Sequence, residues 1–327
     1  MANVVEMKGI TKVFPGTVAN DNVDFTLEKG EIHVLLGENG AGKTTLMNVL
    51  YGLYQPEAGE IYINDKKVEI KSPKDAISLG IGMVHQHFML IHNFTIAENM
   101  VLGQEPKKRA LSIDMEKAKK DTKELADKYG FNIDPDSVID DITVGQQQKV
   151  EILKALYRGA EILILDEPTA VLTPQEIQDF GIILKNLVKE GKSIILITHK
   201  LKEVMSMSDR VTIIRRGKYI DTVKTKDTDI DGLAEMMVGR KINLQINKKA
   251  LARKISEISL SEDDELFVHN DKKIIMSTFQ NDVNPLICKK IVKNQTQEEK
   301  TLSLENRNYK IVNQTLSIFG LSSLYPY

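Results

Sequence analysis

Polar and apolar residues alternate along the first part of the chain, which is the pattern of strands with one buried face. Val23, Phe25 and Leu27 alternate with polar neighbours, and the segment 4–14 mixes β-branched and polar residues. Alternation with a period of two places such apolar side chains on one side of a sheet. We therefore expect two antiparallel strands here, the one over 4–14 at the sheet edge, and a further strand pair over 59–70.

Later apolar runs are continuous instead of alternating. Largely apolar segments occupy 31–36, 81–85, 162–165 and 193–197, and such runs are typical of strands buried on both faces. Helical periodicity covers 95–160, and a helix is expected over 175–189, followed by a closing hairpin over 211–223. These patterns predict an α/β core with an N-terminal antiparallel β subdomain and an inserted helical subdomain.

Composition and charge narrow the class of protein. The 327 residues include 42% hydrophobic and 28% charged positions, as in ordinary globular proteins, and the net charge of −2 gives no sign of nucleic-acid binding. Cys288 is the only cysteine, which fits a reducing cytoplasm. The N-terminus lacks a signal-peptide layout, and no apolar run approaches the roughly 20 residues that span a bilayer. Any membrane role is therefore expected to come through a partner.

A glycine-rich stretch follows the first continuous apolar run. It fits the phosphate-loop pattern G-x-x-x-x-G-K-[ST] between a predicted strand and a predicted helix. Glycines and the helix N-terminus can present backbone N–H groups to phosphates, Lys43 can reach the β- and γ-phosphates, and the Thr44 hydroxyl is expected to ligate Mg²⁺. The core is thus predicted to be that of a P-loop NTPase. The residues of this stretch are Gly37, Glu38, Asn39, Gly40, Ala41, Gly42, Lys43 and Thr44.

Two adjacent carboxylates end the apolar run over 162–165. Such charges at the tip of a buried strand cost free energy unless they are used. With Mg²⁺ and a phosphate loop nearby, Asp166 is the expected metal partner, and Glu167 can orient and deprotonate an attacking water. A surface turn is the alternative, but it does not account for this arrangement.

Two other polar residues follow predicted buried strands. His199 ends the run over 193–197, where ligands bind in open α/β sheets, so it could contact the γ-phosphate or serve only as a core or capping histidine. Gln86 is the polar exit of the strand over 81–85. The nearby His85, His87 and His92 are interpreted as loop histidines because no cysteine or carboxylate cluster accompanies them.

Two features permit two readings each. Thr143 and Gln146 have the spacing of a capping box, yet the threonine hydroxyl, the Gly145 N–H and a helix N-terminus could also bind a phosphate. Phe14 could fold back onto an adenine ring or be a core aromatic.

Taken in order, these motifs resemble the ATP-binding cassette (ABC) ATPases over about residues 4–240. The resemblance implies that Phe14 stacks on adenine, that the residues from Gly37 to Thr45 hold the phosphates of ATP, and that Glu167 is the catalytic base. It also implies a γ-phosphate switch at His199, and Mg²⁺ ligation by Thr44, Gln86 and Asp166, with Gln86 also reporting on a permease. The signature that completes the site across a dimer would be Thr143, Val144, Gly145 and Gln146.

Three positions depart from the usual family pattern. Ile142-Thr143 stands where Leu-Ser is usual, Val144 stands for a glycine, and Thr173 stands for an aspartate. The first change could reduce turnover, and the last two resemble the sugar and nucleoside importer branch. That branch usually carries two cassettes in one chain. Here only Gly320, of 20 glycines, lies after residue 240, so a second phosphate loop is absent from this sequence.

We therefore expect a cassette over 1–240 and a divergent or truncated, weakly folded tail over 241–327. The expected function is an ATPase subunit at the cytoplasmic face of a membrane. Its partners would be a second cassette, permease subunits, and through them an extracytoplasmic solute receptor. The alternatives are a nucleotide-binding regulatory subunit with little hydrolysis, and a cassette acting on ribosomes or DNA, which the near-neutral charge argues against.

Overall fold

The computed structural model describes residues 2–86, 88–109 and 112–240, and five short strands between residues 264 and 310. The chain divides into two compact units, Met1–Ile242 and Asn243–Tyr327. None of the helices in the described ranges is both long enough and apolar enough to cross a membrane. The prediction of a weakly folded tail falls mostly on residues outside the described ranges.

A six-stranded sheet forms the centre of the first unit. Its strand order is β12-β11-β3-β10-β9-β6, and all neighbouring pairs are parallel except β11 with β12. Three of the predicted apolar runs form the inner strands β3, β9 and β10, and the fourth forms the edge strand β6; all four strands are buried along their whole length. The strands are β3 (Ile32–Leu36), β6 (Ile81–Val84), β9 (Ile162–Asp166), β10 (Ser193–Thr198), β11 (Arg210–Arg215) and β12 (Lys218–Lys224).

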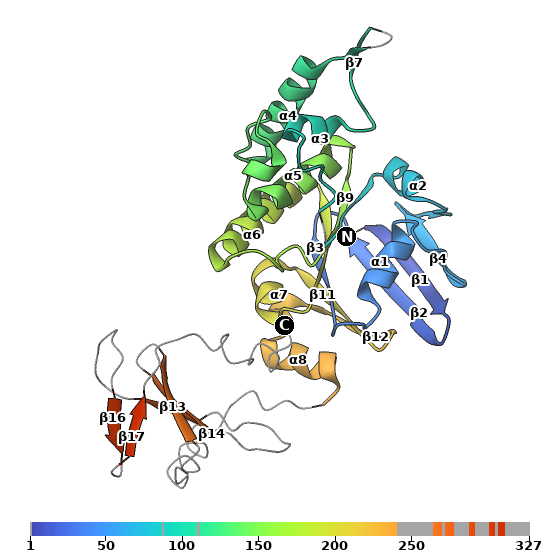
Figure 1. Cartoon of the computed structure of the whole chain (residues 1–327). Helices are drawn as coiled ribbons and strands as arrows, with labels where there is room; N and C mark the ends of the chain where they lie inside the picture. Colours follow the sequence, from blue (N-terminus) through green and yellow to red (C-terminus); the bar gives the residue numbers. More distant parts are fainter. Residues whose placement is uncertain are drawn as a thin grey trace. The chain divides into compact units, whose positions relative to one another are not determined.

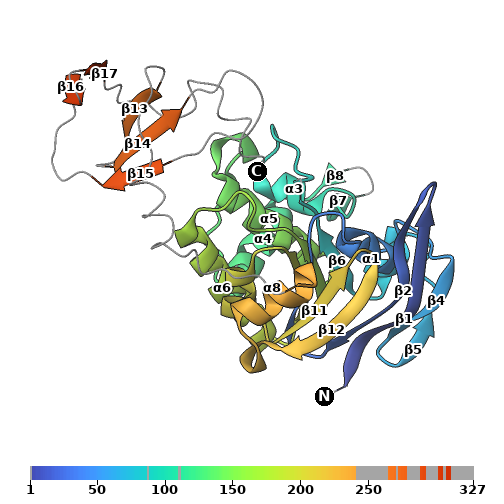
Figure 2. The ribbon, with the colours of Figure 1, turned by 90° about the horizontal axis from the view of Figure 1, so that it is seen from below.

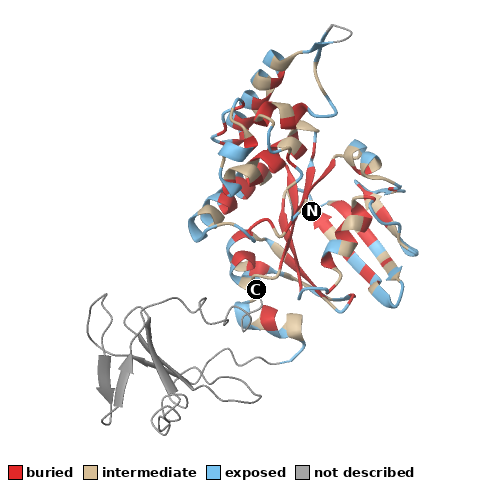
Figure 3. Cartoon of the chain, viewed as in Figure 1, coloured by how far each residue is buried: buried red, intermediate tan, exposed pale blue. Residues whose placement is uncertain are grey.

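Successive residues of the inner strands point into two separate hydrophobic clusters, one on each face of the sheet. Val34, Leu165 and Leu196 belong to the first cluster, and their neighbours Leu35 and Ile164 belong to the second. Since both faces are covered, the runs are apolar throughout. Figure 3 shows the resulting continuous band of buried positions along these strands.

An antiparallel sheet and helix α1 (Lys43–Leu50) cover one face. The sheet has the order β2-β1-β4-β5, with β1 (Asn3–Phe14), β2 (Thr17–Glu28), β4 (Ala58–Ile63) and β5 (Lys66–Val68). The expected β subdomain is therefore present, as Figure 2 shows beside α1. The prediction that the strand over 4–14 lies at an edge is wrong, because β1 pairs with β2 on one side and β4 on the other.

The helical block packs against the other face (Figure 1). Thr143 and Thr95 each begin a helix there through a capping box. The threonine hydroxyl accepts a hydrogen bond from the backbone N–H three residues later, and the glutamine or glutamate side chain at that position accepts one from the backbone N–H of the threonine. A short hairpin, β7 (Lys107–Arg109) and β8 (Ser112–Ile113), interrupts the expected helical periodicity. The helices are α3 (Ile96–Val101), α4 (Met115–Tyr129) and α5 (Val144–Tyr157).

The first unit also contains the 16-residue helix α6 (Pro174–Lys189) and the shorter helices α2 (Pro73–Ser78), α7 (Leu201–Met207) and α8 (Ile230–Val238). Single helical turns lie at η1 (Ile139–Asp141) and η2 (Thr225–Asp227). The second unit contains a three-stranded sheet of β13 (Asp264–His269), β14 (Lys272–Ser277) and β15 (Cys288–Ile291). It also contains the pair β16 (Thr301–Leu304) and β17 (Arg307–Lys310).

Candidate active site

The sequence-predicted site residues follow the carboxyl ends of four neighbouring parallel strands. Gly37 follows β3, His199 follows β10, and Gln86 comes shortly after β6. Asp166 is the last residue of β9, and Glu167 follows it. These strands lie side by side in the order β3-β10-β9-β6. Because carboxyl ends of parallel strands meet at one edge of the sheet, the fold brings these separated segments to the place where open α/β sheets bind ligands.

The phosphate loop is wedged between two backbone segments. Gly42 has φ +99°, and a Cβ there would collide with the carbonyl oxygen of Ala19. A Cβ at Gly37 would likewise collide with the carbonyl oxygen of Ile214 on β11. Glycine is thus required at both positions, by conformation at the first and by close backbone approach at both.

Lys43 is the first residue of α1 and is 5% exposed. Its ammonium group donates to the carbonyl oxygens of Gly37 at 2.8 Å and of Glu38 at 2.9 Å. Burial lowers the pKa of the Lys43 ammonium from its usual value, and the nearby Glu167 and Asp166 carboxylates oppose that shift. The charge is therefore held inside the loop, facing the two carboxylates.

Thr44 and Asp166 meet although 122 residues separate them in the sequence: the Thr44 hydroxyl donates to Asp166 Oδ1 at 3.3 Å. Asp166 is 5% exposed, and burial raises the pKa of its carboxyl above the usual value. A hydroxyl beside a poorly solvated carboxylate is a donor set that fits Mg²⁺, which uses few protein oxygens and takes the rest from water and phosphates. In the described ranges, no cluster of three His, Cys, Asp or Glu side chains could hold a metal without such help.

Glu167 and His199 form a direct pair. His199 Nδ1 lies 2.8 Å from Glu167 Oε1, with the carboxylate more buried than the imidazole. The backbone of Glu167 has φ +45°, and its N–H donates to the Ile197 carbonyl on β10 at 3.0 Å. A non-glycine residue rarely adopts this conformation, so neighbouring structure must hold it.

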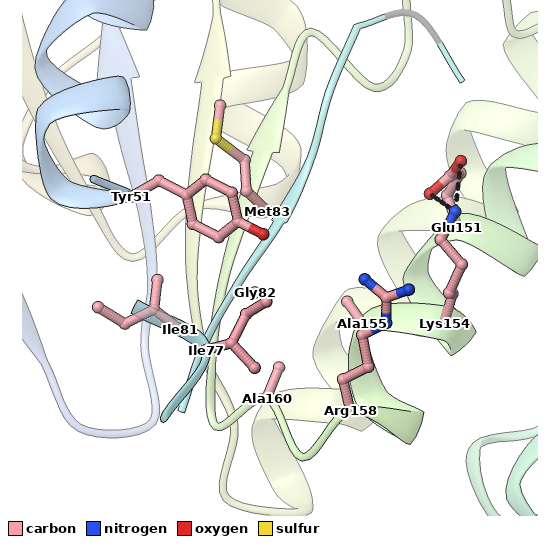
Figure 4. Close-up of a pocket in the computed structure, with 10 residues that line it drawn as sticks. All are labelled: Tyr51, Ile77, Ile81, Gly82, Met83, Glu151, Lys154, Ala155, Arg158 and Ala160. Atoms are coloured by element: carbon pink, nitrogen blue, oxygen red, sulfur yellow. Dashed lines mark hydrogen bonds and ion pairs between the residues drawn. The ribbon is translucent and has the colours of Figure 1, made fainter. Parts of the chain in front are cut away.

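Gln86 is exposed, and the segment after it is tied to helix α5. The Met89 N–H donates to Glu151 at 2.7 Å, and Lys154 donates to the Met89 carbonyl at 2.9 Å. Figure 4 shows Glu151 and Lys154 of α5, with Arg158 just after its end, across a small pocket from Tyr51. His87 lies outside the described residues.

A cleft of about 420 Å³ lies over the phosphate loop. Its lining comes from Thr17–Ala19 of β2, Gly40–Thr45, and Arg216 with Gly217 at the β11–β12 turn. Phe14 is not part of this lining; its ring packs edge-on against Tyr54 at a centroid distance of 5.3 Å. Phe14 nevertheless pairs with Thr17 in the hairpin that borders the cleft, so its stacking on adenine stays a prediction.

The capping reading of the signature segment is confirmed. The Thr143 hydroxyl accepts from the Gln146 N–H at 3.3 Å, and Gln146 Oε1 accepts from the Thr143 N–H at 3.0 Å. Thr143 and Val144 are exposed, whereas Gly145 is buried against Glu176 of α6. None of the four residues lines the cleft over the phosphate loop, so phosphate binding by the signature stays a prediction and would involve another chain.

Sequence reasoning missed a polar cluster behind the Glu167–His199 pair, formed by Thr169, Thr198, Lys200 and Glu203. Glu203 lies four residues after His199, in a helix too short for periodicity to reveal. It also missed that the turn of the predicted hairpin over 211–223, at Arg216 and Gly217, packs on the phosphate loop. There the Gly217 N–H donates to the Ala41 carbonyl at 3.0 Å.

Comparison with known proteins identifies similar proteins that are named as ATP-binding proteins of import systems. The sequence profile described as "ABC transporter" matches residues 20–170. The chain is 58% identical over 255 residues to the nucleoside import ATP-binding protein NupA of Lactococcus lactis, covering 77% of this chain and 50% of NupA. It is 60% identical over 250 residues to the guanosine import ATP-binding protein NupO of Bacillus subtilis, covering 76% of this chain and 49% of NupO. The chain thus spans about half the length of these relatives.

Solved structures agree at the level of the fold. An ATP-binding cassette of an ABC transporter in its ADP conformation is 25% identical to this chain, with a TM-score of 0.65. The match covers 73% of this chain and 100% of that one. A bacterial ABC transporter cassette solved as a dimer is 27% identical, with a TM-score of 0.58 over 68% of this chain and 98% of that one.

Proposed function

We propose that this chain is an ATP-binding cassette of the ABC transporter family, whose model matches residues 20–170, and that it hydrolyses ATP to power a membrane importer of nucleosides or simple sugars. The main support for this proposal is that three features lie together at the carboxyl ends of adjacent strands: the phosphate loop, the Thr44–Asp166 contact and the Glu167–His199 pair. The ATP-binding cassette domain is proposed to extend over residues 1–240.

Each residue has a proposed task in the reaction. The loop from Gly37 to Thr45 holds the phosphates through backbone N–H groups, and Lys43 neutralises the β- and γ-phosphates. Glu167 orients the attacking water and accepts its proton. The bond from the water oxygen to the γ-phosphorus forms as the bond from that phosphorus to the β,γ-bridging oxygen breaks, and ADP leaves with the electron pair of the broken bond. His199, bonded to Glu167, contacts the γ-phosphate.

The metal site would be formed by Thr44 and Asp166, with Gln86 as a third contact. When bound there, Mg²⁺ neutralises charge on the β- and γ-phosphates. The Thr44 hydroxyl lies 3.3 Å from Asp166 Oδ1, which supports the proposal that these two residues share one ion. Phe14 pairs with Thr17, which lines the cleft over the phosphate loop, and we propose that Phe14 stacks on the adenine.

Completion of the site would require a second cassette. The signature residues Thr143 to Gln146 begin α5, which packs in the hydrophobic cluster opposite to that of α1. A second chain would bring its own Thr143 hydroxyl and Gly145 N–H to the triphosphate held by this chain's Lys43. Dimerisation of a 27% identical cassette supports this arrangement.

The segment after Gln86 is the proposed contact with the permease. Met89 is 67% exposed, which is unusual for a large apolar side chain, while its backbone is fixed to α5 at both N–H and carbonyl. A permease pressing on Met89 would therefore move both the Gln86 region and the signature helix. Through the permease, the subunit would serve an extracytoplasmic solute receptor from a peripheral position on the membrane.

A phosphate-release assay with the purified chain, Mg²⁺ and ATP tests the proposal. Release that saturates with ATP and is lost in Lys43→Ala would support it. ATP binding without phosphate release, alone or with added permease, would instead favour a nucleotide-binding regulatory subunit. A folded chain that does neither would refute both functions.

A further inference from the structure

Glu203 is a buried carboxylate directly behind the candidate active site. It lies on α7, and its side chain is 6% exposed. Its Oε2 accepts from the Thr169 hydroxyl at 2.6 Å and from the Thr198 hydroxyl at 3.4 Å, while Oε1 pairs with Lys200 Nζ at 3.2 Å. Three polar groups from the carboxyl ends of β9 and β10 thus converge on the Glu203 carboxylate.

The partners of Glu203 flank the proposed catalytic pair. Thr169 follows Glu167 by two residues, and Thr198 and Lys200 lie on either side of His199. Lys200 Nζ also donates to the Thr169 carbonyl at 2.8 Å. The loop after β9 and the loop after β10 are therefore linked twice, once through Glu203 and once through Lys200.

A purely packing role does not explain this choice of residue. Burying a carboxylate costs free energy that an apolar side chain of the same size would not incur. The strained backbone of Glu167, at φ +45°, needs surrounding contacts to persist, and Thr169 is fixed within the same turn. The contacts of Glu203 supply that restraint at the point where the two loops meet.

We infer that Glu203 is a positioning residue, which holds the Glu167 carboxylate and the His199 imidazole in their paired geometry by linking Thr169 to Thr198 and Lys200. The inference rests on the proposed ATPase function. Misplacement of a reacting group by about 1 Å can cost on the order of a hundredfold in rate without affecting binding contacts. Glu203 touches none of the residues that line the cleft over the phosphate loop, so its loss should change turnover and leave ATP affinity unchanged.

Glu203→Gln in the full-length chain tests this, with Glu31→Gln as matched control. Glu31 is equally buried at 7% side-chain exposure and is bonded to His33 and Arg210, but it precedes β3 at the opposite end of the strands from the site. Glu203→Gln is expected to lower kcat by roughly tenfold to a hundredfold, with KM for ATP within about twofold. Glu31→Gln should leave both constants unchanged in the folded protein.

A second readout does not depend on hydrolysis. The imidazole ¹⁵N shifts of His199, assigned with His199→Gln, should change in Glu203→Gln and not in Glu31→Gln. Thr169→Val, which removes one donor to Glu203, should produce the same changes in smaller measure and replaces Glu203→Gln if that variant does not fold.

The outcomes separate the two proposals. A wild-type chain that does not hydrolyse ATP contradicts the proposed function, and the His199 shifts then decide the positioning role alone. Wild-type hydrolysis with an unchanged kcat in Glu203→Gln, or equal losses in Glu203→Gln and Glu31→Gln, would overturn the positioning role. Unchanged His199 shifts would overturn it as well.

Discussion

His199 Nδ1 lies 2.8 Å from Glu167 Oε1, so the loops after β10 and β9 meet through a hydrogen bond between an imidazole and a carboxylate. The pair occupies the same sheet edge as Lys43 and Asp166, whose charges influence each other. A carboxylate held by an imidazole has a fixed orientation, which is what a proton acceptor for an attacking water requires.

Replacing Glu167 by glutamine is expected to reduce phosphate release by about 10²- to 10⁴-fold, because the amide cannot accept the proton of the water. ATP binding should persist, since the phosphate loop is untouched. Glu190→Gln makes the same chemical change at an exposed position after α6 and should behave as wild type. A Glu167→Gln variant with wild-type turnover would refute the role of base.

Replacing Asp166 by asparagine is expected to weaken the effect of Mg²⁺. The amide keeps the shape that accepts the Thr44 hydroxyl at 3.3 Å but removes the negative charge that attracts the ion. Hydrolysis measured against Mg²⁺ concentration should therefore shift to higher concentrations in Asp166→Asn. An unchanged Mg²⁺ dependence would place the metal elsewhere.

Thr143 is expected to contribute to stability and to catalysis in ways that two variants separate. Thr143→Ala removes the hydroxyl that caps α5 and should cost about 1 kcal/mol in the free energy of unfolding, measured in urea. Thr143→Ser keeps the hydroxyl, so this variant should retain both the helix cap and the wild-type rate of ATP hydrolysis. If the Thr143→Ser and Thr143→Ala variants hydrolyse ATP at the same rate, the Thr143 hydroxyl makes no contact with a triphosphate.

His33 is expected to make the folded chain acid-sensitive. The side chain is fully buried on β3, and burial lowers the pKa of its imidazole below the usual value of 6.5. The unfolded chain then binds a proton more readily than the folded chain, so stability falls as the pH drops below about 6.5. In the non-titrating variant His33→Gln, this part of the slope of unfolding free energy against pH should disappear.

The slope is the relevant quantity for His33, because a substitution in the core also changes stability at every pH. The matched control is His92→Gln, since His92 is exposed and pairs with the equally exposed Asp140. That control should keep the wild-type slope. Identical slopes for wild type and His33→Gln would contradict the account.

The sequence could place part of the candidate site because Gly37, Asp166 and Glu167 come directly after hydrophobic runs and His199 comes shortly after one. Glu167 and His199 could be placed at strand ends from the apolar runs that precede them, and the spacing of Gly37 to Thr44 fits a phosphate loop. The order of the strands could not be read in this way, because it depends on which crossovers bring β10 between β3 and β9. The edge position assigned to β1 failed for that reason.

Other features depend on contacts that no local pattern encodes. Glu203 belongs to a seven-residue helix, and its importance lies in partners from two different loops. The turn at Arg216 and Gly217 reaches the phosphate loop only through the pairing of β11 with β3. The capping box of Thr143 was recognisable from spacing, but spacing cannot distinguish a cap from a phosphate site, since one hydroxyl can serve both.

The central claim is that separated segments enclose a magnesium-bound triphosphate. Titration of the full-length chain with ATP, in the presence and absence of Mg²⁺, tests it most directly, with Lys43→Ala and the exposed-site control Lys8→Ala measured alongside. We predict saturable binding that Mg²⁺ strengthens, that Lys8→Ala retains, and that Lys43→Ala weakens at least about tenfold. A folded wild-type chain that shows no binding, or a Lys43→Ala variant that binds as tightly as wild type, would contradict it.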